Sequence, residues 1–249
     1  MARLTLLCFG PFCATLAGRS LTNLARSPKM QSLLAYLALE KQRIHTRDAL
    51  ATLLWPDEPE RTARQNLRQV LYQLRLLLGE APDVAPPTAA FLLITHDTVQ
   101  FNPASDYSLD VATFLAHLAQ QQRAQAVEIY QDELLTGLTS ESRLFEEWLL
   151  LKREQFHIQA LDALAYLTQQ ALTQADYPQV QTYAWRQLAL DPWREEAHRH
   201  LMQALAAVGE RSAALAQYEI CRRALAEGLG VEPDAETQVL VAKIRSVES

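Results

Sequence analysis

The sequence predicts a mainly α-helical protein with a small β component, built from an α+β domain over residues 1–105 and an all-α domain of helical repeats over residues 106–249. Three observations predict this fold class. Short β-rich runs lie near residues 3–16 and 91–101, apolar residues recur at three- and four-residue steps over most of the remaining chain, and two turn sequences in the second half are 34 residues apart.

The composition of the 249 residues restricts the class of protein. With 49% hydrophobic residues the chain can bury two ordinary cores, and no apolar run approaches the roughly 20 residues that span a bilayer. Three cysteines without a Cys-x-x-Cys spacing argue against a disulfide framework or a zinc site. We therefore expect a soluble, cytoplasmic protein with no membrane segment, no metal and no cofactor.

The charge is unevenly divided along the chain. The net charge is −6, but residues 1–110 carry 11 Lys and Arg against 10 Asp and Glu, whereas residues 111–249 carry 12 against 19. Within residues 26–75 the count is 9 basic against 5 acidic. The first domain is thus basic where a nucleic acid would bind, although the whole chain is acidic.

The first domain begins with strands and a helix. The runs 3–9 and 12–16 are broken by Gly10-Pro11, a turn signal, and predict a small antiparallel sheet. Ser27 before Pro28 predicts the N-cap and first residue of a helix that extends to about residue 40.

Two further helices follow. Thr46 is the expected N-cap of the second, and Trp55-Pro56 ends it. Asp57 with Glu60 three residues later resembles a capping box for the third, and Gly79 suits the residue just after the end of that helix.

The third helix has two distinct faces. Its apolar residues fall on one side, which we expect to be buried: Ala63, Leu67, Val70, Leu71, Leu74, Leu77 and Leu78. The other side carries donors of hydrogen bonds or positive charge: Arg61, Arg64, Gln65, Arg68, Gln69, Tyr72 and Gln73. Ordinary exposed faces mix both signs of charge, whereas Arg and Gln are the side chains that contact phosphates and base edges of DNA. The simpler explanation is an amphipathic helix that happens to be basic.

A β-hairpin completes the first domain. Residues 91–95 and 98–101 are β-rich and flank His96-Asp97, a two-residue polar turn. The order of sheet, helix, helix, long basic helix and hairpin is that of a winged helix-turn-helix, whose third helix enters the major groove. By helical angle Gln65, Gln69 and Tyr72 are candidates for base edges. We expect the phosphates to meet Arg64, Arg68 and Arg75 on the flanks of the helix and Arg47 near the start of the second helix. Arg61 is also expected to face the DNA.

The second half is helical throughout. Helices are expected near 110–120, 122–135, 142–173, 177–190, 194–208, 211–228 and 234–246. Ala175-Asp176-Tyr177 and Gly209-Glu210-Arg211 are 34 residues apart, which is the tetratricopeptide period and predicts stacked helix pairs.

Motifs that could carry metal or catalytic chemistry have simpler explanations. They are Glu154/His157 and Glu195/His198, which resemble half of a di-iron site, and His96/Asp97, an adjacent His–carboxylate pair. Glu-x-x-His pairs on acidic helices are usually solvated, and a hairpin turn explains the third pair. We therefore expect no catalytic residues and no enzyme.

Particular residues in both halves resemble one bacterial family. In the first half these are Phe9-Gly10-Pro11, Gly18-Arg19, Arg47 to Leu50, Leu54 to Asp57, Asn66-Leu67, Leu74-Arg75 and Leu78-Gly79. In the second half they are Asp191 to Leu205, Ala214 to Tyr218 and Leu225 to Pro233. The chain resembles the SARP class of transcriptional activators, in which a response-regulator-type winged helix precedes a bacterial transcriptional activator domain.

This resemblance implies a function and a set of partners. It implies an activator that binds direct repeats of double-stranded promoter DNA, often as a homodimer, and recruits RNA polymerase. The loop between the second and third helices would face polymerase, with Trp55, Asp57, Glu58 and Glu60. The hairpin departs from the family because it begins Phe91-Leu92-Leu93-Ile94 and lacks an arginine at its tip, which leaves more of the recognition to the third helix.

An adaptor function is the alternative. The helical repeats would bind an unknown protein partner, and the winged helix would serve as a docking module. The acidic second half and the altered hairpin favour this interpretation, and a weak salt dependence of binding would distinguish it from DNA binding.

Overall fold

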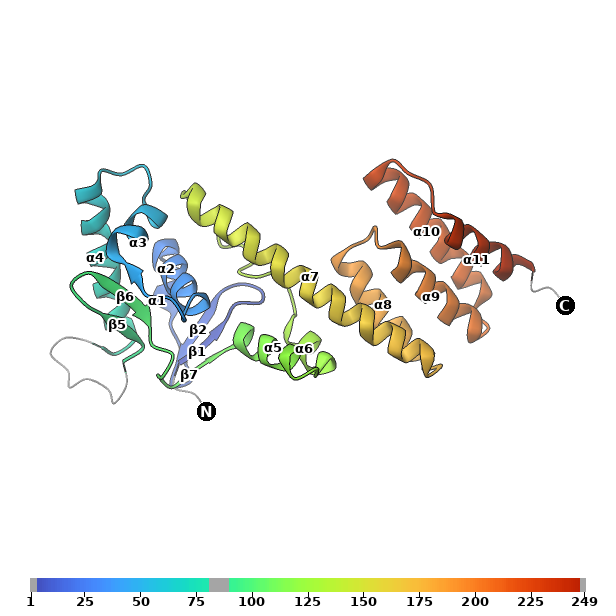
Figure 1. Ribbon diagram of the computed structural model, residues 1–249, viewed down its shortest axis with the longest axis horizontal. Coiled ribbons are helices and arrows are strands. Elements are labelled where there is room, and N and C mark those ends of the chain that lie inside the picture. Colours follow the sequence, from blue (N-terminus) through green and yellow to red (C-terminus); the bar gives the residue numbers. More distant parts are fainter. Residues whose placement is uncertain (1–3, 81–89, 247–249) are drawn as a thin grey trace. The chain divides into compact units, whose positions relative to one another are not determined.

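The computed structural model describes residues 4–80 and 90–246. The chain forms two compact units, Met1–Gln120 with Glu128–Phe156 and Gln121–Val127 with His157–Ser249, and each is described by itself. In the described ranges helices dominate and strands belong to the first unit (Figure 1), so the predicted fold class is confirmed. No helix within these ranges combines the length and the apolar character needed to cross a membrane.

The first unit opens with a small sheet. β1 (Leu4–Leu7) pairs antiparallel with β2 (Cys13–Leu16), which pairs with β3 (Arg19–Ser20). On its other side β1 pairs in parallel with β7 (Tyr107–Leu109), so the strand order is β3-β2-β1-β7. The alternation of the strand buries the leucines of β1 that face the helices, and Leu6 lies opposite the last residue of β7.

Four helices follow the sheet: α1 (Thr22–Ala25), α2 (Pro28–Leu39), α3 (Arg47–Leu54) and α4 (Glu60–Leu77). The predicted caps of α2 and α3 are confirmed. The Ser27 hydroxyl accepts from the amide of Met30 at 3.4 Å, and the Thr46 hydroxyl accepts from the amide of Ala49 at 3.2 Å. Gly79 follows α4 with a φ of +73°, a left-handed conformation that glycine adopts without strain.

The predicted capping box at the start of α4 is wrong. The helix begins at Glu60, its N-cap is Pro59, and no side chain caps it. An N-cap at Asp57 would make Glu58 the first helical residue, directly before Pro59. The proline ring disfavours the α conformation in the residue that precedes it, so the helix starts only after the proline. Asp57 instead lies exposed in the turn.

The second sheet contains the predicted hairpin. β5 (Leu92–Ile94) and β6 (Thr98–Phe101) pair antiparallel, and the amide of Thr95 donates to the carbonyl of Thr98 at 2.9 Å across the turn. A short strand before α3, β4 (His45–Thr46), pairs with β6 and gives the order β4-β6-β5. The hairpin is thereby joined to the residue that caps α3.

The end of the first unit is tied back to its start. α5 (Asp110–Ala119) follows β7 directly. The carboxylate of Asp110 accepts the amides of Cys8 at 2.6 Å and Phe9 at 2.9 Å, and burial raises the pKa of this carboxyl. Since β7 and α5 belong to the first unit, the two units do not divide at the expected boundary of residues 105 and 106.

Two further helices have residues in both units. α6 (Arg123–Ile129) is shorter than the predicted helix 122–135, because the backbone after it pairs with the turn at Gly10 instead. α7 (Arg143–Thr173) is anchored within the first unit through Glu40. The carboxylate of Glu40 accepts from Trp148 Nε1 at 3.0 Å and pairs with Lys152 Nζ at 2.9 Å. Burial opposes ionisation of Glu40, but these two donors prevail and lower its pKa.

The second unit is a helical repeat. Its last four helices are α8 (Tyr177–Leu190), α9 (Glu195–Ala207), α10 (Arg211–Leu229) and α11 (Ala235–Ser246). The turns before α8 and α10 have the same backbone hydrogen bonds, shifted by 34 residues. The amides of Ala175 and Asp176 donate to Leu172 and Ala171, and those of Gly209 and Glu210 donate to Ala206 and Leu205. Ala175 and Gly209 both have positive φ, so the predicted repeat is visible in the backbone itself.

The polar residues of the family-like segment 191–205 stabilise this repeat. Arg199 pairs with Asp234 at 2.8 Å, while the carboxylate of Glu195 accepts the amide of Asp234 at 2.7 Å. His198 is buried, with its Nε2 3.0 Å from the carbonyl of Pro192 and its Nδ1 2.6 Å from the amide nitrogen of Gln217. Both ring nitrogens are therefore engaged inside the repeat. Among residues 4–80 and 90–246, no group of three His, Cys, Asp or Glu side chains is placed to hold a metal ion.

Candidate nucleic-acid interface

α4 buries one face and presents the other to solvent. The helix packs against α1, α2 and α3. Five of the expected core residues are buried: Ala63, Leu67, Leu71, Leu74 and Leu78. Val70 and Leu77 are partly buried. At about 25 cal/mol per Å² of apolar surface, each buried leucine contributes roughly 1.5–3 kcal/mol, which fixes the rotation of the helix about its axis. The same rotation exposes the polar face.

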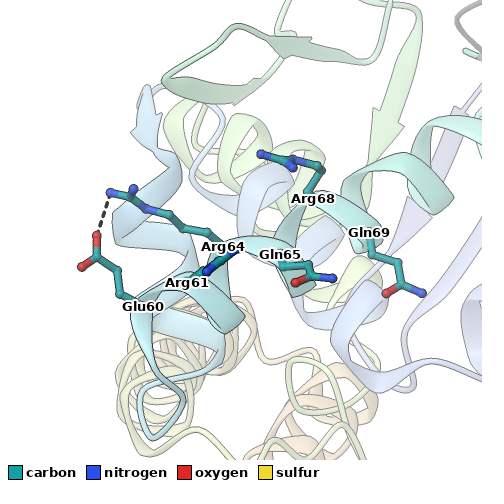
Figure 2. Close-up of a pocket in the computed structure, with 6 residues that line it drawn as sticks. All are labelled: Glu60, Arg61, Arg64, Gln65, Arg68 and Gln69. Carbon is teal, nitrogen blue, oxygen red and sulfur yellow. Dashed lines mark ion pairs between the residues drawn. The ribbon is translucent and has the colours of Figure 1, made fainter.

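The exposed face carries most of the residues that the sequence assigns to DNA. Arg61, Arg64, Gln65, Arg68, Gln69 and Tyr72 are all exposed. Five of these side chains, together with Glu60, line a hollow of about 660 Å³ (Figure 2). In Figure 2, Gln69 extends from the helix away from the ion pair that joins Glu60 to Arg64, and no dashed line joins Arg68 to the other side chains drawn. The structure thus brings the predicted third-helix residues onto one continuous surface.

Arg64 differs from its neighbours on this surface. Its Nε lies 2.6 Å from Oδ1 of Asp48 and its Nη2 lies 2.8 Å from Oδ2 of the same carboxylate, a bidentate pair. The same Nη2 lies 2.8 Å from Oε1 of Glu60. The hydrogen bond and charge of Asp48, with the charge of Glu60, raise the pKa of Arg64. The partnership with Asp48 cannot be predicted from the sequence, because it depends on how α3 crosses α4. The spacing of Glu60 and Arg64, in contrast, is the i,i+4 spacing of a helical ion pair.

Arg61 and Arg68 have free guanidinium groups. Across residues 4–80 and 90–246 neither forms an ion pair or a side-chain hydrogen bond. They are seven residues apart and therefore on the same side of the helix, separated by roughly 10 Å along its axis at 1.5 Å per residue. Arg75, one turn of the helix further on from Tyr72, is partly buried. Among the described residues of α4, Arg61 and Arg68 are therefore cations that are both exposed and unpaired, while Arg75 is unpaired but partly buried.

Arg47 is committed to the hairpin. Its Nη2 donates to the carbonyl of Thr95 at 2.9 Å and its Nε donates to the same oxygen at 3.2 Å. Its backbone amide donates to the carbonyl of Asp97 at 2.9 Å. The start of α3 is therefore attached to the hairpin turn. At the tip, the side chains of His96 and Asp97 are largely exposed, and His96 Nδ1 lies 2.6 Å from Oδ1 of Asp97.

The loop between α3 and α4 presents acidic and aromatic side chains. Asp57 and Glu58 are exposed, and Trp55 is partly buried. Lys29 lies 5.7 Å from the centroid of the Trp55 ring and donates to the carbonyl of Leu54 at 2.8 Å. A smaller hollow of about 260 Å³ lies between this loop and the two helices. Of the four residues that the family resemblance assigns to polymerase, Glu60 is the one engaged in an ion pair.

Two family models match the chain. The model described as bacterial transcriptional activator domain matches residues 109–245, which is more than half of the chain. The model described as transcriptional regulatory protein, C terminal, matches residues 22–86, a segment that contains α3 and α4. These two segments correspond to the two parts of the family that the sequence resembles.

Regulatory proteins are among the relatives of the chain. The regulatory protein AfsR of Streptomyces coelicolor is 27% identical over 241 residues, which cover 94% of this chain and 23% of AfsR. The transcriptional regulatory protein MoaR1 of Mycobacterium tuberculosis is 26% identical over 256 residues, covering 94% of this chain and 77% of MoaR1. The chain therefore spans about a quarter of the length of AfsR.

One solved structure has the same fold along the chain. It is Mycobacterium tuberculosis EmbR in complex with a low-affinity phosphopeptide, with a TM-score of 0.68 at 21% identity. The match covers 100% of this chain and 66% of the EmbR chain. The family match, the order of the two segments and the geometry of α3 and α4 lead to one conclusion. The chain belongs to the bacterial transcriptional activator domain family, and its two matched segments are those of the SARP class.

Proposed function

We propose that this regulator binds double-stranded promoter DNA by inserting the exposed face of α4 into the major groove. The observation that carries the proposal is the composition of that face, which from Arg61 to Gln73 contains no acidic residue and includes two unpaired guanidinium groups. DNA presents phosphates at the rim of the groove and hydrogen-bonding base edges at its floor. A row of Arg, Gln and Tyr side chains matches both.

The side chains on α4 have different roles in this proposal. Gln65, Gln69 and Tyr72 lie farthest from the buried face and contact base edges, where an amide can pair with adenine. Arg61 and Arg68 contact phosphates, and Arg75 does so at the end of the helix. Arg47 holds the hairpin in place through Thr95 and supplies its remaining donors to the backbone of the DNA.

Mobility shifts on an operator defined by footprinting test these roles. Gln69→Ala should cost about 1–3 kcal/mol at one base pair and relax the preference there. Arg68→Ala should weaken binding to all sequences alike and flatten the slope of log K against log salt concentration by about one. Arg222→Ala, an exposed arginine on α10, is the matched control and should change neither quantity. The interface assignment is wrong if a variant carrying Arg61→Glu and Arg68→Glu binds as tightly as the parent.

The finer features of activation belong to the same proposal. The regulator binds direct repeats as a side-by-side dimer, and the loop with Trp55, Asp57 and Glu58 contacts RNA polymerase. The exposure of the two acidic side chains supports this role, as does the resemblance to the SARP class.

A second candidate function is a protein adaptor. Three aromatic side chains of the second unit are about half exposed: Tyr166 at 51%, Trp185 at 50% and Trp193 at 47%. Exposed aromatic residues are enriched in protein interfaces. A partner bound to an apolar surface would keep its affinity between 50 and 200 mM salt, whereas DNA bound through several phosphates would lose orders of magnitude.

A further inference from the structure

The start of α4 holds three charged groups that belong to two helices. Asp48 lies in the first turn of α3, Glu60 is the first residue of α4, and Arg64 lies one turn later. The guanidinium group contacts both carboxylates at 2.6–2.8 Å. The three groups together carry one net negative charge, whereas the face of α4 from Arg61 to Gln73 contains no acidic residue.

The position of Asp48 determines which edge of the guanidinium group is occupied. Nε and Nη2 form the edge that binds a carboxylate or a phosphate with two parallel hydrogen bonds. Both of these atoms already donate to Asp48, and Nη2 also contacts Glu60. A phosphate that approached this edge would have to displace Asp48 while two carboxylates repelled it. Arg61 and Arg68 meet no such competition from the described residues 4–80 and 90–246.

The pairing is nevertheless reversible. The side chains of Arg64, Asp48 and Glu60 are 50%, 60% and 76% exposed, respectively. Ion pairs this exposed contribute little to stability, because water solvates the separated charges well. The carboxylates therefore compete with an outside anion without making the pair permanent, and their removal should leave the fold intact.

We propose that Asp48 and Glu60 restrain sequence-independent DNA binding by withholding Arg64 from the phosphate backbone. This inference rests on the proposed DNA-binding function. Sequence-independent affinity grows with the number of phosphates that a protein neutralises. One withheld arginine lowers that affinity on every duplex, so a larger share of the total binding energy comes from base contacts made by Gln65 and Gln69.

The test measures binding to a random-sequence duplex as a function of salt. Five proteins are compared: the parent chain, D48N/E60Q, R64A, D48N/E60Q/R64A and E147Q. The last is a matched control, because Glu147 forms an exposed i,i+4 ion pair with Arg143, with 2.7 Å between Oε1 and Nε, and both residues belong to α7. The parent, R64A and E147Q should have the same slope. D48N/E60Q should gain about one phosphate contact, so that its affinity falls an additional ~3.5-fold between 50 and 200 mM salt. The triple variant should return to the parent slope.

Two outcomes would overturn the inference. If R64A alone flattens the slope by about one, Arg64 already contacts phosphate in the parent. If the gain of D48N/E60Q persists in the triple variant, the carboxylates act by general repulsion and not through Arg64. Circular dichroism checks folding, and D48N alone, which removes only the bidentate partner, repeats the test. Failure of the proposed function has a different signature, because Arg68→Ala would then leave binding to every duplex unchanged.

Discussion

In the second unit, the indole ring of Trp193 occupies the space next to Gly228 that any other residue would fill with its side chain. A Cβ atom on Gly228, inside α10, would lie 2.0 Å from Nε1 of Trp193 and 2.5 Å from Cε2. The indole ring therefore lies directly on the helix backbone, a position that a side chain at residue 228 would block. Glycine is unfavourable inside a helix by about 1 kcal/mol relative to alanine, so its presence here needs such a reason.

Gly228→Ala should destabilise the second unit. The added methyl group displaces the indole, which is 47% exposed and thus has about half of its surface to lose. At about 25 cal/mol per Å² for a side chain that buries 150–250 Å² in full, this loss is roughly 2–3 kcal/mol and exceeds the gain in helix propensity of about 1 kcal/mol. Urea denaturation followed by tryptophan fluorescence measures the difference. In a Trp193→Ala background the same substitution should be neutral or stabilising, and the contact is unimportant if both backgrounds respond alike.

Buried histidines make the second unit sensitive to acid. Burial lowers the pKa of His198 and of His200 below the usual value near 6.5. Between the folded and the unfolded pKa the unfolded chain binds more protons, so stability is complete above about pH 6.5 and is lost as the pH falls through the folded pKa.

The urea concentration at the unfolding midpoint should therefore decrease as the pH is lowered from 7.5 to 5.5. His198→Gln should reduce this dependence, because the glutamine does not titrate and can still bond to Gln217. Burial alone would raise the pKa of Asp234, but the hydrogen bonds from Thr237 and the charge of Arg199 together outweigh it and lower that pKa. Asp234 therefore affects stability only at lower pH. A midpoint that stays constant across this range in the parent would contradict the argument.

The exposed residues of the candidate interface were predicted individually from the sequence, but the pairing of Arg64 with Asp48 was not. The exposed face of α4 follows from periodicity alone, because burial of Leu67 and Leu71 fixes the opposite side. The free state of Arg68 and the bound state of Arg64 do not follow, since the two arginines lie only about 40° apart around the helix and both point away from the core. Asp48 distinguishes them, and its reach to Arg64 depends on the packing of α3 against α4.

At the scale of elements, the helices that begin with a hydroxyl residue were predicted to within a residue or two. The caps at Ser27 and Thr46 work because each can lie in an extended conformation just before helical backbone. The same argument gave a wrong N-cap at Asp57, because Pro59 prevents the helix from beginning before Glu60. The short strands β4 and β7 were not predicted, since two or three residues carry no period and are strands only through their partners.

The hairpin is held to α3 by one arginine, and removing it should loosen the turn. Arg47→Ala deletes two hydrogen bonds to the carbonyl of Thr95 but leaves the backbone bond to Asp97. Because these bonds are exposed, we expect the local opening free energy to fall by about 0.5–1 kcal/mol, which is a two- to fivefold faster hydrogen exchange at the amides of Thr95 and Thr98. Arg43→Ala, one turn earlier in the connection, is the control. Unchanged exchange in Arg47→Ala would show that the backbone bond is sufficient.

At the scale of the whole molecule, DNA binding and activation should be separable. Asp57 and Glu58 are exposed and do not cap α4, so D57N/E58Q should preserve the helix and its DNA affinity. If the loop contacts polymerase, transcription from a purified promoter system should fall several-fold in this variant. Glu60 is left unchanged because it pairs with Arg64. An equal loss of DNA affinity and transcription would place the two acidic residues in the DNA interface instead.

The parallel pairing of β7 with β1 limits how such regulators can be recombined. β7 lies beyond residue 105, yet it completes the sheet that the first strand begins, and Asp110 fastens the same region to Cys8 and Phe9. A gene fusion cut at residue 105 would uncover a hydrogen-bonding strand edge beside buried leucines, which invites pairing between chains. Natural or engineered chimaeras that give this DNA-binding half a new effector should therefore retain the chain through residue 156, the end of its compact unit.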